Sequence, residues 1–221
     1  MAKELDIAIE LPEKHASSSL GRLKPKGRVA LRSGSSTQFR IVPVSVARAL
    51  LKLQESGDLH VPSLAAFSQT LSQVYEDCAW KRLVGLIDMR DYSSKEALEK
   101  LRLDGFPEDV REAAVERAKG CYLIDDMRYG EFFIRGKINA GWGRERIQRE
   151  LEVKGIQPQS VPGWPDEYFS DEADYERAYA IASRKHLTGK NDFQKLMRLL
   201  ASKGYPASLA YRVVHDVLDG E

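Results

Sequence analysis

One helix ending occurs three times along the chain: EALEKLRLDGF at residues 96–106, RIQRELEVKGI at 146–156 and FQKLMRLLASKGY at 193–205. In each, a leucine stands four positions before a glycine, and a large apolar residue follows the glycine. The glycines, Gly105, Gly155 and Gly204, lie 50 and 49 residues apart. Glycine readily adopts the left-handed backbone that ends a helix, and the next apolar residue packs on the last turn. The sequence therefore predicts an internal repeat.

Each repeat is expected to contain three helices. A second helix with apolar periodicity follows the glycine in the first and third repeats, around Val110 and Val213. The narrow apolar stripe of one unit buries little surface alone, so the units should stack into an all-α, elongated and curved array. We place the repeats at residues 77–124, 125–169 and 170–221. Ser63, Asp88, Ser93, Ser170 and Asn191 are candidate helix N-caps.

An acidic, proline-containing loop, VPGWPDEYFSDEAD, joins the second repeat to the third and carries its acids at residues 166–174. Its aromatic residues Trp164, Tyr168 and Phe169 are expected to anchor the loop on a neighbouring repeat. Binding of a partner by these rings is the alternative.

The N-terminal part has a different composition. Residues 12–40 are rich in Ser, Gly and Pro, and nine Lys or Arg but no acids lie between Lys14 and Lys52. We expect residues 1–40 to form a flexible basic tail, which is either a solvated linker or an arm that contacts phosphates. Residues 41–76 should form a small N-terminal element. In it a strand at 38–44, QFRIVPV, is followed by a helix capped by Ser45, and Leu59–Val61 then pairs back with the strand as a β-hairpin.

Composition excludes several classes of protein. The 34 basic and 33 acidic residues nearly balance, so any electrostatic signal lies in their pattern. The two cysteines and four histidines lack metal-ligand spacing, and no nucleophile elbow or phosphate-binding loop occurs. No secretory leader or membrane span is recognisable. We therefore expect a cytoplasmic, monomeric protein that is not an enzyme, with no metal, cofactor or membrane partner.

Basic residues concentrate in two stretches. From Arg135 to Arg149 five cations are opposed by Glu145 alone, and from Arg184 to Lys203 six cations are opposed by Asp192 alone. As a group they form a candidate surface for DNA or a protein filament, and a solvated face with local salt bridges is the alternative. Arg146 is expected to pair with Glu150, four residues on. The candidate binding residues are Arg135, Lys137, Arg144, Arg146, Arg149, Lys154, Arg184, Lys185, Lys190, Lys195 and Arg198.

Adjacent carboxylates at Asp125 and Asp126, followed by Arg128, allow two interpretations. Such a pair can bind Mg²⁺ or act as acid and base. It can also cap the N-terminus of the helix that follows. The position just before an apolar-periodic segment favours the structural role.

The second repeat resembles proteins of the RecX family at two places. Residues 125–135, DDMRYGEFFIR, resemble the family pattern DDxRFAxxFxR, and residues 143–156, GRERIQRELEVKGI, resemble GxxRIxxELxxKGI. Ser93, Glu96 and Lys100 match the first-repeat pattern, so the resemblance covers residues 77–221. Tyr129, Gly130 and Ala97 depart from the patterns and put local packing in doubt.

The resemblance implies a regulator of the RecA recombinase. Such a protein binds the RecA–DNA filament, with its single- and double-stranded DNA. It modulates, and here is expected to inhibit, the ATPase, recombinase and coprotease activities used in homologous recombination and the SOS response. The alternative is a sequence-independent DNA-binding helical module that acts without RecA.

Overall fold

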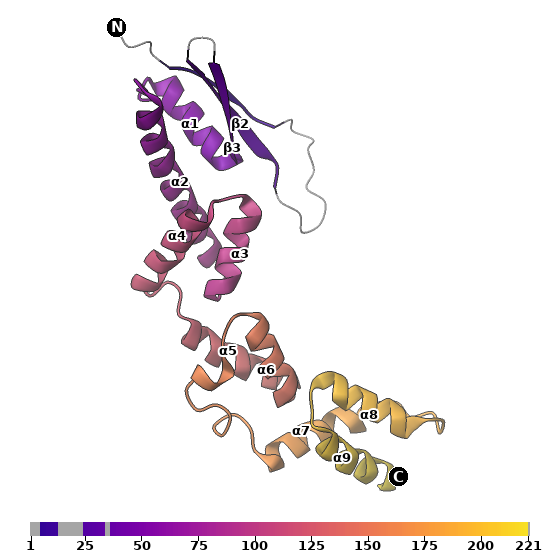
Figure 1. The fold of residues 1–221 in the computed structure, drawn as a ribbon. Coiled ribbons are helices and arrows are strands. Elements are labelled where there is room, and N and C mark those ends of the chain that lie inside the picture. The colour runs from indigo at the N-terminus through magenta and orange to yellow at the C-terminus, as the bar shows by residue number, and fades with distance from the viewer. Residues whose placement is uncertain (1–4, 13–23, 34–35, 221) are drawn as a thin grey trace. The chain divides into compact units, whose positions relative to one another are not determined.

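The protein was analysed as a computed structural model that describes residues 5–12, 24–33 and 36–220. The chain forms two compact units, residues 1–124 and 125–221. Helices make up most of both units, as expected, and a small antiparallel sheet begins the first (Figure 1). In the described part of the chain, no helix has the length and hydrophobicity needed to cross a membrane.

The sheet corrects the expected basic tail. It consists of β1 (Asp6–Glu10), β2 (Lys26–Ser33) and β3 (Ser36–Pro43), in the order β1-β2-β3. The tail prediction was therefore wrong for these residues, and its parts at 1–4, 13–23 and 34–35 lie outside the described residues. A strand at 38–44 is confirmed, but its partner is β2, where Val29 and Leu31 are buried between exposed arginines. Leu59–Val61 forms no strand.

Helix α1 (Val44–Ser56) follows the sheet directly and packs on it (Figure 1). Pro43, and not Ser45, is its N-cap. The sheet and helix approach closely because Gly27 has no side chain: a Cβ there would lie 2.5 Å from the Cβ of Ala47. Val42 and Leu50 belong to the buried core between them.

The first repeat continues this core. It comprises α2 (Leu64–Ile87), α3 (Ser94–Asp104) and α4 (Glu108–Gly120). The expected boundary between residues 76 and 77 falls inside α2, so the N-terminal element and the first repeat share one helix and one core. Ser63 caps α2, and Ser93 forms a capping box with Glu96 at the start of α3. These two caps were predicted correctly.

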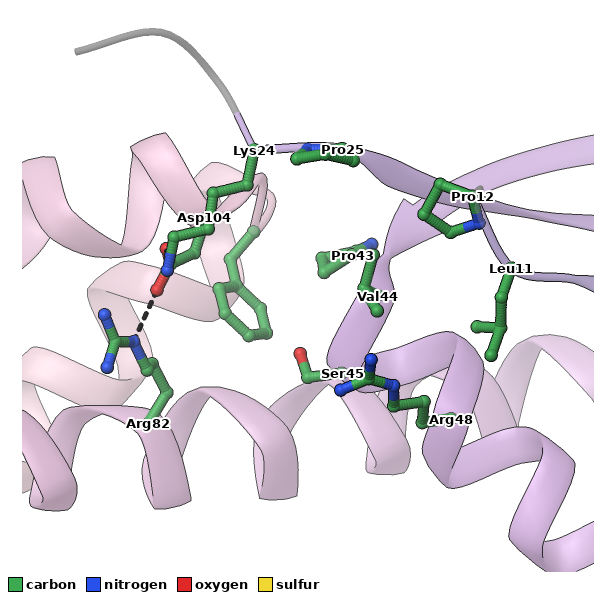
Figure 2. A pocket seen from close by; sticks show the side chains of 11 residues that line it. Leu11, Pro12, Lys24, Pro25, Pro43, Val44, Ser45, Arg48, Arg82 and Asp104 are labelled. Atoms are coloured by element: carbon green, nitrogen blue, oxygen red, sulfur yellow. Dashed lines mark hydrogen bonds and ion pairs between the residues drawn. The ribbon is translucent and has the colours of Figure 1, made fainter. Parts of the chain in front are cut away.

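The buried carboxylate of Asp104 links the segment before β2 to helices α2 and α3. Asp104, only 8% exposed, accepts a hydrogen bond of 2.6 Å from Arg82 Nε and lies 2.5 Å from Lys24 Nζ. Figure 2 shows these groups on one side of a cavity of about 580 Å³, with Ser45 and Arg48 on the other. Because both cations share one buried carboxylate, this polar wall joins α2 and α3 to the segment entering β2.

The second unit holds the other two repeats, which have separate cores. The second repeat comprises α5 (Asp126–Asn139), α6 (Arg144–Val153) and the 3-10 helix η1 (Pro158–Ser160). The third comprises α7 (Asp171–Ser183), α8 (Asp192–Lys203) and α9 (Ala207–Asp219). The third helix of the second repeat is only one turn because prolines at 158, 162 and 165 lack the N–H that helix continuation needs.

Aromatic residues of the acidic loop complete the core of the second repeat. Tyr168 is buried, and Trp164 and Phe169 pack against the same cluster, with their ring centroids 5.3 Å apart. The Tyr168 hydroxyl donates to the Pro162 carbonyl at 3.0 Å. The anchoring role is confirmed, although the loop anchors on its own repeat.

All three predicted helix endings are present. Gly105, Gly155 and Gly204 have φ angles of 91°, 81° and 88°. In each, the next residue donates its N–H to the carbonyl of the leucine four positions before the glycine, at 3.1, 2.9 and 3.1 Å. Those next residues, Phe106, Ile156 and Tyr205, are buried. The endings are therefore Schellman motifs whose apolar residues enter the core.

Candidate nucleic-acid and filament interface

The carboxylates at the start of the second repeat have a structural role at Asp125. Its Oδ1 accepts hydrogen bonds from the N–H groups of Met127 at 2.9 Å and Arg128 at 3.0 Å. These bonds satisfy donors that the first turn of α5 leaves free, as the N-cap interpretation predicted. Asp126 is the first helical residue. Within the described residues, no group of three or more His, Cys, Asp or Glu side chains is arranged to hold a metal ion.

The packing around residue 130 explains why glycine stands where the RecX pattern has alanine. A Cβ at this position would lie 2.8 Å from Val161 Cγ2. The residue after η1 therefore packs directly on the backbone of α5. The missing methyl group makes room for the loop that closes the repeat.

A row of aromatic rings and cations lies along α5 and α6. Its rings are Tyr129, Phe133 and Trp142, with centroids 6.2 Å apart for the first pair and 6.4 Å for the second. The first pair is stacked, with 14° between ring planes, whereas Trp142 meets Phe133 edge to face at 82°. We call this row, together with the cations Lys137, Arg146 and Lys154, the cation–aromatic ladder.

Each ring of the ladder has a cation over it. The guanidinium of Arg146 lies 3.7 Å from the Trp142 centroid, and Lys137 Nζ lies 4.6 Å from the same ring and 5.2 Å from Phe133. Lys154 Nζ lies 5.3 Å from Phe133 and 5.6 Å from Tyr129. All six side chains are partly exposed. The ladder therefore combines positive charge with aromatic faces at the protein surface.

Two further cations of the second repeat lie over rings outside the ladder. Arg135 and Arg144 are exposed and lie over the rings of Tyr168 and Trp164, at 5.3 and 5.9 Å. Arg149 is exposed, and among the described residues it forms no ion pair. The structure therefore divides the single basic stretch of the sequence into two groups with different neighbours.

Arg144 also has an acidic neighbour. Burial raises the pKa of Asp174, and the positive charges of Arg177 and Arg144 oppose that rise. Asp174 forms an ion pair with Arg177. Arg144 therefore has an acidic side chain of the third repeat in its surroundings, whereas Arg149 forms no ion pair among the described residues.

The basic stretch of the third repeat is only partly available. Arg184, Lys185, Lys190 and Arg198 are exposed, but Lys195 pairs with Asp192 at 2.9 Å. The hydrogen bond from Lys195, together with those from the N–H groups of Gly189 and Thr188, holds the pKa of Asp192 below its usual value. Asp192, and not the predicted cap Asn191, organises the start of α8, since Asn191 makes no side-chain cap.

The second and third repeats meet backbone to backbone. The N–H of Gly143 donates to the Lys203 carbonyl at 2.8 Å, and that of Glu145 donates to the Gly204 carbonyl at 3.2 Å. Free donors at the start of α6 therefore bind free acceptors at the end of α8, without a side-chain cap. Arg146 adds a hydrogen bond of 3.1 Å to the Ser202 carbonyl. This arrangement fixes one end of the ladder against the third repeat.

The expected pair between Arg146 and Glu150 is wrong. Arg146 turns instead to the Trp142 ring and the Ser202 carbonyl, and the described residues contain no ion pair between it and Glu150. The sequence interpretation also missed the ladder rings as a group. Their signal was the four-residue spacing of Tyr129, Phe133 and Lys137, which places all three on one helix face.

Comparisons with known proteins agree with this architecture. A family model described as RecX, second three-helix domain, matches residues 125–161. The chain is 31% identical over 146 residues to Regulatory protein RecX of Legionella pneumophila (strain Corby), which spans 63% of this chain and 94% of that protein. It is 29% identical over 128 residues to Regulatory protein RecX of Stenotrophomonas maltophilia (strain R551-3), with 57% and 78% covered.

Solved structures share the fold. A crystal structure of regulatory protein RecX has a TM-score of 0.59 at 20% identity, covering 86% of this chain and 94% of that one. The crystal structure of RecX from Lactobacillus salivarius has a TM-score of 0.54 at 20% identity, with 65% and 96% covered. The extent of the Legionella match, together with the glycine-ended helical repeats, shows that this chain belongs to the RecX family of regulatory proteins.

Proposed function

We propose that the protein binds the RecA–DNA filament and inhibits its ATPase, recombinase and coprotease activities in DNA repair and the SOS response. Membership of the RecX family, whose relatives are named regulatory proteins, is the observation that carries this proposal. The protein acts by binding and not by catalysis, as a cytoplasmic monomer that needs no cofactor.

The exposed cations of the second unit are the proposed contact surface. Lysine and arginine that meet phosphates release condensed counterions, which makes binding strong at low salt and weak at high salt. In this proposal Arg149, Arg198 and the ladder meet DNA phosphates or acidic filament surface, and the bound protein blocks subunit exchange and access of a second DNA. Filament DNA in single- and double-stranded form presents the phosphates that this surface needs.

A second candidate function is sequence-independent DNA binding without RecA. The cation–aromatic ladder favours it, because cations beside aromatic rings are a recurrent means of binding nucleic acid. The two functions differ in one observable: only the first changes ATP hydrolysis by RecA filaments.

Charge reversal tests the proposed surface. The double variant Arg149→Glu and Arg198→Glu should require about tenfold more protein for half-maximal inhibition of RecA ATPase on single-stranded DNA, because lost phosphate contacts weaken binding at every sequence. Both side chains are exposed, and within the described residues the side chain of Arg198 bonds only to the carbonyl of Gln194 in its own helix, so folding should be kept.

The matched control reverses two exposed cations of the first repeat, Lys95 and Lys100, by substitution with glutamate. It changes the net charge by the same amount on the other unit, and its inhibition should stay close to wild type. Equal loss of inhibition in both doubles would reject the surface and indicate a general effect of net charge.

A further inference from the structure

The cation–aromatic ladder has the properties of a stacking surface as well as those of a charged one. We propose that it binds single-stranded nucleic acid, in which the phosphates draw the ladder cations off the rings and bases take their place on Tyr129, Phe133 and Trp142. This inference rests on the proposed function, because it names the form of nucleic acid that the second repeat binds and the atoms that bind it.

The rings lie at the edge of the core and are partly exposed. Lys137 Nζ lies over Phe133 and Trp142, and the Arg146 guanidinium lies over Trp142, while all these side chains are partly exposed. A cation can sit over a ring only if that face is not covered by the core. The rings also pack against the core of the repeat, in which Ile134, Ile147 and Leu151 are fully buried.

The spacing of the rings fits a flexible single strand. Successive centroids lie 6.2 and 6.4 Å apart, so neighbouring nucleotides of an extended strand can each reach one ring. Bases of a duplex are stacked and paired with each other, and their faces are therefore not available to a protein side chain. Base–aromatic stacking works for every base because each has a π-face, so little sequence preference is expected.

The ladder cations are placed to hold phosphates beside stacked bases. Within the described residues neither Lys137 nor Arg146 forms an ion pair. The charges of these two cations therefore remain available to a polyanion.

Binding to a strand with and without bases separates stacking from charge. The full-length protein is titrated into fluorescein-labelled oligo(dT), an abasic strand and a duplex, each of about 15 nucleotides or base pairs, and anisotropy is recorded. We expect the wild type to bind oligo(dT) about tenfold more tightly than the abasic strand, which carries the same phosphates. The duplex should also bind more weakly than oligo(dT), despite its greater charge.

Phe133→Leu keeps apolar bulk but removes one ring, so it should remove most of the advantage of oligo(dT) while leaving abasic binding unchanged. Phe132→Leu is the control, since Phe132 is 66% exposed on the same helix and outside the ladder. Equal affinity of the wild type for oligo(dT) and the abasic strand overturns the inference without reliance on any variant. So does a Phe133→Leu protein, folded by circular dichroism, that loses affinity equally for both strands.

The assay contains no recombinase, so its failure is distinguishable from failure of the proposed function. A protein that does not prefer strands with bases but still inhibits RecA ATPase contradicts only the stacking surface. A protein with that preference and no effect on RecA contradicts only the regulatory role.

Discussion

Substitution of Gly204 by alanine is expected to destabilise the second unit by about 3–5 kcal/mol. Gly204 has φ +88°, a conformation that costs a residue with Cβ about 1–2 kcal/mol. An added Cβ would also lie 2.4 Å from both the backbone nitrogen and the Cβ of Arg146. Relieving that clash requires α6 and α8 to separate, which costs about 1 kcal/mol for each hydrogen bond lost between them. Urea unfolding followed by circular dichroism and tryptophan fluorescence measures the change.

Two further variants separate the causes of this effect. Gly143→Ala has no backbone penalty, since φ is −84°, but its Cβ would lie 2.4 Å from the Gly204 carbonyl oxygen. Gly189→Ala has a backbone penalty, since φ is +71°, but no steric clash, since no atom lies within 4 Å of the new Cβ. Gly143→Ala should therefore be strongly destabilising and Gly189→Ala should cost only about 1–2 kcal/mol. A loss at Gly204 no larger than that at Gly189 would contradict the close contact between the repeats.

Leu151→Ala should cost the second repeat about 3 kcal/mol, within the usual range for a buried leucine. Leu151 is fully buried in a cluster with only five other buried side chains, and its carbonyl accepts the hydrogen bond from Ile156 that ends α6. Such a small cluster cannot easily close over the cavity that alanine leaves. Because α5 and α6 carry the ladder, oligo(dT) affinity should fall together with stability.

The matched control is Val153→Ala on the same helix, where the side chain is 67% exposed. Its free energy of unfolding should change by less than about 0.5 kcal/mol, as is usual for surface positions. Chemical denaturation of both variants under identical conditions gives the comparison. If Leu151→Ala were as mild as Val153→Ala, the small separate core of the second repeat would be the wrong description.

The helical part of the fold was predictable because its signals are local. A glycine that needs positive φ, a leucine four residues earlier and a serine at the helix start all act within one or two turns, and Gly155, Leu151 and Ser93 behave as their sequence context indicates. The sheet was less predictable. The pairing of β2 with β3 depends on burial of Val29 and Leu31 against α1, which the polar composition around them concealed.

In the candidate site, too, local features were predictable and contacts between distant segments were not. The cations were identified from charge alone, but their sorting depends on packing between segments far apart in the sequence. Arg146 donates a hydrogen bond to the carbonyl of Ser202, 56 residues away, and the charge of Arg144 lowers the pKa of Asp174. No local rule joins these partners, whereas the i, i+4 spacing of Tyr129 and Phe133 is local and was available in the sequence.

The central claim is that this RecX-family protein regulates the RecA filament through its charged second unit. The most direct measurement is a titration of the wild-type protein into RecA filaments on single-stranded DNA, with ATP hydrolysis followed at two salt concentrations. Hydrolysis should fall with amounts of protein well below one per RecA subunit, and higher salt should weaken the inhibition. Unchanged hydrolysis throughout the titration, by a protein that still binds the DNA alone, would contradict the claim.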